Sequence, residues 1–185
     1  MGIYIVAMAA LFFLAFAFFA VGQASVTRNS AQTAADSAAL AAARERRDAV
    51  QDQFLAALAA GDPDLLGRLL TTVGTVDRGD PCGTARQFAA DNDATTTRCD
   101  ALSGPVGYVV DVVTRGTVGT SVVDGTENVR ATATATAVVE PRCVFRDKLA
   151  AALEFTCDHR EVTIDPKAGN FRLNLATFYT VHLTK

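Results

Sequence analysis

The feature that most constrains this chain is a run of 19 apolar residues near its N-terminus, residues 3–21, with the sequence IYIVAMAALFFLAFAFFAV. The run contains no charged residue, no glycine and no proline. As an α-helix it would be about 28 Å long, which is close to the ~30 Å thickness of the hydrocarbon core of a bilayer. We therefore expect a membrane helix over residues 1–24.

A cleaved signal peptide is the alternative interpretation of this run. Gly22, Gln23 and Ala24 offer small residues at a possible cleavage site. However, no basic region precedes the run, and its length exceeds the roughly 7–15 apolar residues of a signal peptide. The sequence that follows also continues as a helix without a break, which favours a retained membrane helix.

Residues 25–60 extend the helix beyond the apolar run. They contain no proline and no glycine, and good helix formers dominate them. Gly61 is a typical C-terminal stop, and Asp62 and Pro63 are typical of the cap and first residue of a new short helix. The sequence thus predicts one rod over residues 3–60, about 85 Å long if straight.

Small residues form one face in the middle of this rod. Small side chains let helices approach closely, as in small-xxx-small interfaces between membrane helices. We predict that this face packs against other copies of the rod, and the alternative is a solvated, alanine-rich stalk. The face consists of Ala31, Ala34, Ala35, Ala38 and Ala42.

The last part of the rod has a face of large apolar residues. An exposed row of this kind would invite aggregation, so we expect residues 43–58 to pack on a β-sheet of the following domain. The apolar face consists of Val50, Phe54, Leu55 and Leu58, and the expected partners are Ala131, Ala133 and Ala135, or Leu173 and Leu175.

Residues 61–185 predict a globular α+β domain, with short helices followed by a mainly antiparallel sheet. Alternation of apolar or β-branched residues with polar ones indicates the strands, most clearly in VRATATATAVVE, residues 129–140. The other expected strands are residues 108–114, 117–123 and 171–183, with a hairpin turn at Asp124-Gly125. The expected helices include one that begins at a capping box, residues 84–87, and one over residues 144–155.

Four cysteines fall into two close pairs in this domain. Pairing in sequence order gives Cys82–Cys99 and Cys143–Cys157, and each bond would contribute about 3 kcal/mol in the chain-entropy model. Disulfides form in oxidising compartments, so they place residues 61–185 outside the cytoplasm.

The positive-inside rule favours the opposite orientation. The basic residues nearest to the apolar run are Arg28, Arg44, Arg46 and Arg47, all on its C-terminal side. Three of these arginines lie beyond the range of the rule, so we give the cysteines more weight.

Neither charge nor motif indicates an enzyme or a nucleic-acid-binding protein. The net charge is −3, and no phosphate-binding loop, dinucleotide fingerprint, nucleophile elbow or zinc-protease motif occurs. Cys157 and His159 are the only cysteine and histidine close together, and Asp91-Asn92-Asp93 lacks the later ligands of a calcium loop. We expect no cofactor, no metal and no small-molecule substrate.

The segment after the apolar run, QASVTRNSAQTAADSAALAAARE, resembles the N-terminal region of TadE/TadG-like proteins of the tight-adherence (Tad) pilus. The matching positions are Arg28, Gln32, Ala35-Asp36 and residues 38–42. The resemblance implies a structural, pilin-like subunit at the bacterial cell surface, held in the membrane by residues 3–21, with other pilin-like subunits or copies of itself as partners.

Two features depart from the prepilin pattern. Only Met1 precedes Gly2, and the apolar run contains no glutamate. The missing glutamate favours a TadG-like subunit over a major pilin. The competing hypothesis is a monomeric, membrane-tethered domain outside the cytoplasm that binds a partner at the end of a helical stalk.

Overall fold

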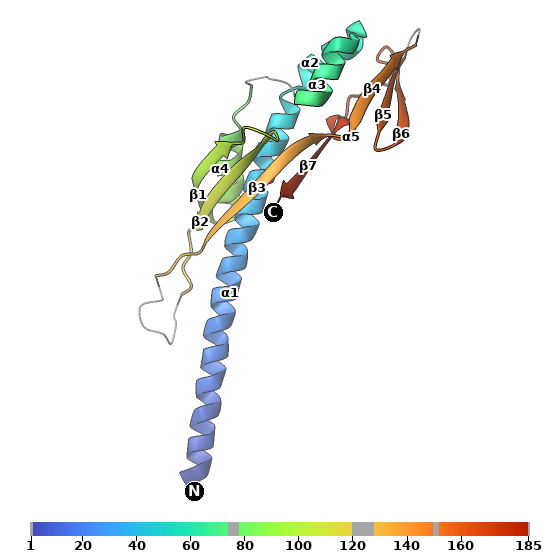
Figure 1. Cartoon of the computed structure of the whole chain (residues 1–185). Coiled ribbons are helices and arrows are strands. Elements are labelled where there is room, and N and C mark those ends of the chain that lie inside the picture. The colour runs from blue at the N-terminus through green and yellow to red at the C-terminus, as the bar shows by residue number, and fades with distance from the viewer. Residues whose placement is uncertain (1, 74–77, 120–127, 150–151, 185) are drawn as a thin grey trace.

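A long helix that protrudes from a mixed helix-and-sheet head gives the protein its shape (Figure 1). The computed structural model describes residues 2–73, 78–119, 128–149 and 152–184. The N-terminal half of the helix stands free of the head, and the C-terminal half runs through it. The predicted α+β architecture, with its long N-terminal helix and antiparallel sheets, is confirmed.

The predicted rod is two helices in close succession, α1 (Gly2–Asp48) and α2 (Gln51–Ala60). A turn at Ala49 and Val50 separates them, where the Val50 N–H donates to the carbonyl three residues back at 3.4 Å. Gly61 ends α2 in the left-handed conformation, with φ of 59°. The predicted helix stop is therefore confirmed, and the rod is interrupted once before it.

Two short helices follow. In α3 (Pro63–Thr72) the Asp62 carboxylate accepts a hydrogen bond from the Leu65 N–H at 3.0 Å, which confirms the predicted cap. In α4 (Pro81–Asp91) the cap is Asp80, whose carboxylate accepts from the Gly83 N–H at 2.7 Å. The predicted start at residues 84–87 is wrong, because Asp80 and Pro81 supply an earlier cap and first residue.

The larger sheet has four antiparallel strands in the order β1-β2-β3-β7. The strands predicted at residues 108–114 and 129–140 are confirmed as β2 and β3, whereas β1 is not among the strands that we expected. Its β-branched run, Thr95 to Thr97, was the available signal. The bounds are β1 (Ala94–Ala101), β2 (Gly107–Thr114), β3 (Thr132–Pro141) and β7 (Tyr179–Thr184).

The smaller sheet has three antiparallel strands, β4 (Cys143–Lys148), β5 (Leu153–Cys157) and β6 (Arg160–Ile164). The helix predicted over residues 144–155 is wrong. Phe145 pairs with Phe155 across β4 and β5, with ring centroids 5.6 Å apart. The spacing of the apolar residues in this stretch fits a helix, but in the structure these residues are placed by pairing of aromatic side chains across two strands.

The predicted strand over residues 171–183 is only partly correct. Asn174 caps a short helix, α5 (Leu175–Phe178), by accepting a hydrogen bond from the Ala176 N–H at 3.0 Å, and β7 begins after it. Residues 117–119 are not in a strand, and residues 120–123 and the turn at Asp124-Gly125 lie outside the described residues.

The centre of the head is the alanine-rich half of α1. This half contacts α4 and the strands β2, β3 and β7. On the facing side of β3, Ala135, Ala137 and Val139 are buried. Small side chains on both elements let the backbones approach closely, which is why alanine is favoured on both. The buried helix residues are Ala31, Ala34, Ala35, Ala38, Ala39, Ala41, Ala42 and Ala43.

An aromatic cluster holds α2 against the rest of the head. Phe54 is fully buried, with ring centroids 4.6 Å from Phe178 and 6.1 Å from Tyr179. Phe178 in turn lies 5.2 Å from Phe155 of β5. The Tyr179 hydroxyl donates to the Leu69 carbonyl of α3 at 2.9 Å, so this buried hydroxyl is satisfied.

The apolar face at the end of the rod is buried, as predicted. The residues that it packs against differ from those that we expected. Val50, Phe54 and Leu58 are buried and Leu55 is half-buried. The rings opposite Phe54 belong to Phe178 and Tyr179, and the alanine face of β3 receives residues 31–43 of α1 instead of residues 43–58.

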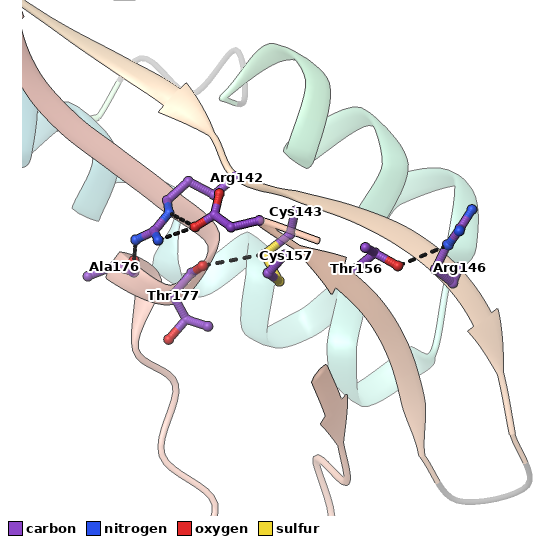
Figure 2. Close-up of a disulfide and its surroundings, with 8 residues drawn as sticks. Arg142, Cys143, Arg146, Thr156, Cys157, Ala176 and Thr177 are labelled. Carbon is purple, nitrogen blue, oxygen red and sulfur yellow. Dashed lines mark hydrogen bonds and ion pairs between the residues drawn. A yellow bond between two sulfur atoms is a disulfide. The ribbon is translucent and has the colours of Figure 1, made fainter. Parts of the chain in front are cut away.

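Both predicted disulfides are present. Cys82 of α4 is bonded to Cys99 of β1, and Cys143 of β4 is bonded to Cys157 of β5. Figure 2 shows the second bond beside α5, where the Cys143 Sγ lies 3.3 Å from the Thr177 carbonyl oxygen. Arg142, at the junction of the two sheets, donates through Nε to the Asp158 carboxylate at 2.7 Å.

The substitution Ala35→Leu tests the close approach of α1 to the sheet. Ala35 has no exposed surface, so three added carbons should lower the free energy of unfolding by about 1–3 kcal/mol. Ala56→Leu, on the exposed side of α2, is the matched control and should change it by less than about 0.5 kcal/mol. Denaturant unfolding of the fragment 25–185 measures both, and equal stability of the two variants would contradict the packing.

Candidate functional site

The exposed half of α1 is the part of the molecule that its own head leaves uncovered. Every large apolar side chain from Ile3 to Val21 is more than half exposed. The helix is long and apolar enough to cross a membrane by length and composition. An apolar surface of this size is typical of a segment that lies in lipid or against a partner.

The first buried residue of the helix sets the height of the head above this segment. The apolar run ends at Val21, and the first buried side chain is Ala31. The nine residues between them correspond to about 14 Å of helix. If the run fills the hydrocarbon core, the base of the head lies just beyond the lipid headgroups.

The alanine face that we predicted as an assembly surface is occupied by the head of the same chain. Ala31, Ala34, Ala35, Ala38 and Ala42 all have no exposed surface. These small residues thus let α1 lie close to α4 and to the sheet of the same chain. In this structure another copy of the helix cannot reach these five residues, so the predicted role for them is corrected.

Two shallow, open hollows lie beside the exposed half of α1, where the head approaches it, and we call them together the groove. Its membrane-side part has a volume of about 740 Å³ and its head-side part about 460 Å³. Val26 lines both parts. The first part is lined by Phe18, Phe19, Gly22, Gln23, Val26, Thr27 and Val118, and the second by Val26, Asn29, Ser30, Thr33, Asp91, Asn92 and Asp93.

The head carries ion pairs elsewhere on its surface. Arg98 donates to Asp111 at 2.7 Å, and this hydrogen bond, with a second from Thr134, holds the pKa of the Asp111 carboxyl below its ordinary value. The hydrogen bond from Arg142 likewise lowers the pKa of Asp158. A carboxylate with a lowered pKa stabilises the fold above its ordinary pKa, and this contribution is lost in acid.

No set of three His, Cys, Asp or Glu side chains is grouped for a metal ion within the described residues. His159 lies in the β5–β6 turn, and the His182 Nε2 is 3.9 Å from the Glu140 carboxylate across β3 and β7. The candidate site is the exposed apolar surface of α1 with the groove beside it.

Comparison with known families identifies the same stretch of chain. The model of the putative Flp pilus-assembly TadE/G-like family matches residues 1–45. The N-terminal segment is TadE/G-like. The match confirms the resemblance seen in the sequence and covers the exposed half of α1 together with the alanines inside the head. No curated protein and no solved structure matches the chain.

Sequence reasoning found the TadE/G-like segment and missed the groove beside it. Asp91-Asn92-Asp93, which lacks the later ligands of a calcium loop, lies at the C-terminal end of α4. Its position against α1 is fixed by the packing of α4 on the helix, where the Asn92 Nδ2 donates to the Ser37 Oγ at 3.1 Å. No local sequence signal marks a contact between residues 55 positions apart.

Removal of residues 1–24 from the TadE/G-like segment should separate membrane binding from folding. The full chain should stay with membranes after a carbonate wash, because the apolar run partitions into lipid. The fragment 25–185 should be soluble without detergent and keep the melting temperature of the head, because it retains every buried residue that the structure describes. Release of the full chain by carbonate would contradict the membrane span.

Proposed function

We propose that the protein is a structural, pilin-like subunit of a Tad-type pilus system at the bacterial cell surface. In this proposal residues 3–21 hold the subunit in the membrane, and its head, which includes the C-terminal half of α1 together with α2 and residues 61–185, lies outside the cytoplasm. The subunit assembles with other subunits through the exposed half of α1, and its role is in surface attachment or in pilus assembly.

The observation that carries the proposal is the continuity of α1. One helix of 47 residues begins in the exposed apolar segment and ends inside the head. The TadE/G-like match spans the same stretch. A subunit built in this way presents a rigid apolar helix for assembly and a separate surface for contacts outside the membrane.

A solvated stalk with an independent binding domain fits the structure less well. A stalk would leave the alanine-rich segment exposed, whereas its alanines from Ala34 to Ala43 are buried against the head.

Electron microscopy of sheared surface material tests the function directly. An epitope tag at the C-terminus, detected by immunogold, should label filaments or their ends in the sheared fraction. Cells that produce the fragment 25–185, exported by an added signal sequence, serve as the control, because without the anchor the label should be absent from filaments. Label that stays with the cell envelope while filaments are shed unlabelled would contradict the proposal.

The two disulfides test the orientation. Protein taken from its native cells and digested without reduction should give the linked pairs Cys82–Cys99 and Cys143–Cys157. Replacing both cysteines of either pair by serine should lower the free energy of unfolding by about 2–4 kcal/mol. Free thiols in the native protein would instead indicate a head on the reducing, cytoplasmic side.

A further inference from the structure

Two segments that continue β2 and β3 extend from the head toward the N-terminal half of α1 (Figure 1). They are residues 115–119 and 128–131, and we call them the basal arms. The Val118 N–H of the first arm donates to the Val129 carbonyl of the second at 2.9 Å. The two arms are therefore joined below the end of the sheet, on the side of the head that faces the apolar run.

The first arm lies against α1 where the apolar run ends. Val118 lines the membrane-side part of the groove together with Phe18 and Phe19, which are among the last four residues of the run. A Cβ added at Gly119 would lie 3.7 Å from the Gln23 Oε1. At 1.5 Å per residue, these contacts lie between about 5 Å below and about 3 Å above the end of the run. The structure thus holds the arm at this height.

The depth of the run in a bilayer therefore sets the depth of the basal arms. If residues 3–21 fill the hydrocarbon core, Val118 lies at its edge, and the headgroup layer above it is about 5–8 Å thick. Val129, which is bonded to Val118, has an exposed fraction of 49%. At this depth the exposed side chain of Val129 meets lipid instead of bulk water.

Each basal arm carries one arginine close to this contact. Arg115 and Arg130 are exposed, and neither forms an ion pair with a residue that the structure describes. The Thr114 N–H donates to the Ala131 carbonyl at 2.9 Å, in register with β2 and β3, so the two arginines come next at facing positions. Like charges at facing positions destabilise paired strands, and a bound anion offsets this cost.

The acidic residues of this region lie farther from the run or outside the described residues. Asp91 and Asp93 line the head-side part of the groove. Asp124 and Glu127 lie between the two arms in sequence and are outside the described residues. Among the described residues, Arg130 is therefore the charged residue nearest to the end of the run on this side of α1.

We propose that the basal arms are a second membrane contact, which binds an anionic phospholipid. Arg115 and Arg130 hold its phosphate. Val118 and Val129 enter the edge of the hydrocarbon, and the acyl chains occupy the apolar, membrane-side part of the groove. The inference rests on the proposed function, which holds residues 3–21 in the membrane.

Such a contact would fix the orientation of the head. A single membrane helix can rotate about its own axis, and its rotation is set by packing and by anchors at the membrane surface. The basal arms lie beside this axis, on the side of the helix that the groove occupies. Lipid bound there would therefore turn the same side of the head toward neighbouring subunits in every copy.

Single tryptophans test the contact, because the chain contains none. Full-length Val129→Trp is reconstituted in vesicles of phosphatidylcholine and phosphatidylglycerol, and bromine on the acyl chains of one of the two lipids quenches a tryptophan that it touches. The relative association constant should favour phosphatidylglycerol by about fivefold or more, the contribution of one arginine at an anionic surface. Val144→Trp is the control. It is exposed on β4, at the end of the head away from the N-terminus, and neither lipid should quench it.

Charge reversal separates a lipid site from the overall surface charge. In the Val129→Trp protein, Arg130→Glu should abolish the preference for phosphatidylglycerol. Arg28→Glu is the matched control, because Arg28 is exposed within about 11 Å of the end of the run but lies about 200° around α1 from Val26, which lines the groove. This variant should keep the preference. Both substitutions are at exposed positions, so the melting temperature should not change.

Equal quenching by the two brominated lipids would overturn the headgroup site, and so would a preference that survives Arg130→Glu. A preference lost equally in Arg28→Glu would assign it to overall surface charge and would also overturn the site. Absence of quenching by both lipids would overturn the whole contact. If the contact fails while the carbonate wash retains the full chain and immunogold labels shed filaments, the basal arms do not bind lipid and the pilus function stands.

Discussion

The contact between alanines of α1 and the small-residue face of β3 is the interaction on which the rest of the structure depends. Ala35, Ala38 and Ala42 have no exposed surface, and Ala137 on the strand has none either. Each methyl group contributes only about 0.8 kcal/mol by burial, so the value of the contact lies in the close fit of two backbones. This fit fixes the direction of α1 relative to the sheet, and with it the position of the head over the membrane segment.

Stability comes largely from other parts of the head, because an alanine interface buries little apolar surface per residue. The rings of Phe54, Phe178 and Phe155 join α2, α5 and the smaller sheet. Cys143–Cys157 also links β4 to β5 of that sheet, and Cys82–Cys99 links α4 to β1, the edge strand of the larger sheet. The alanine interface thus orients α1, whereas the aromatic cluster and the two disulfides supply much of the stability of the head.

Features with a local cause could be predicted from the sequence. The helix stop at Gly61 and the cap at Asp62 depend on neighbouring residues only, and the cysteine pairs lie close in the chain. The alternation of apolar and polar residues over 129–140 correctly predicted the strand β3. The errors arose where two structures share one pattern, as in residues 144–155, whose spacing fits both a helix and a hairpin. The alanine face belongs to the same class, because a small-residue surface does not reveal whether a sheet or another helix covers it.

The burial of that face limits how copies of the protein can meet. From Ala31 onward, buried positions cover about 200° of the helix circumference, and α4 and the sheet occupy this arc. A neighbouring helix can therefore reach the covered side of α1 only below Ala31, within the apolar run or in the short stretch above it. The head thus confines close helix-to-helix contact on this side of α1 to the apolar run, where such contact is van der Waals packing between side chains in lipid.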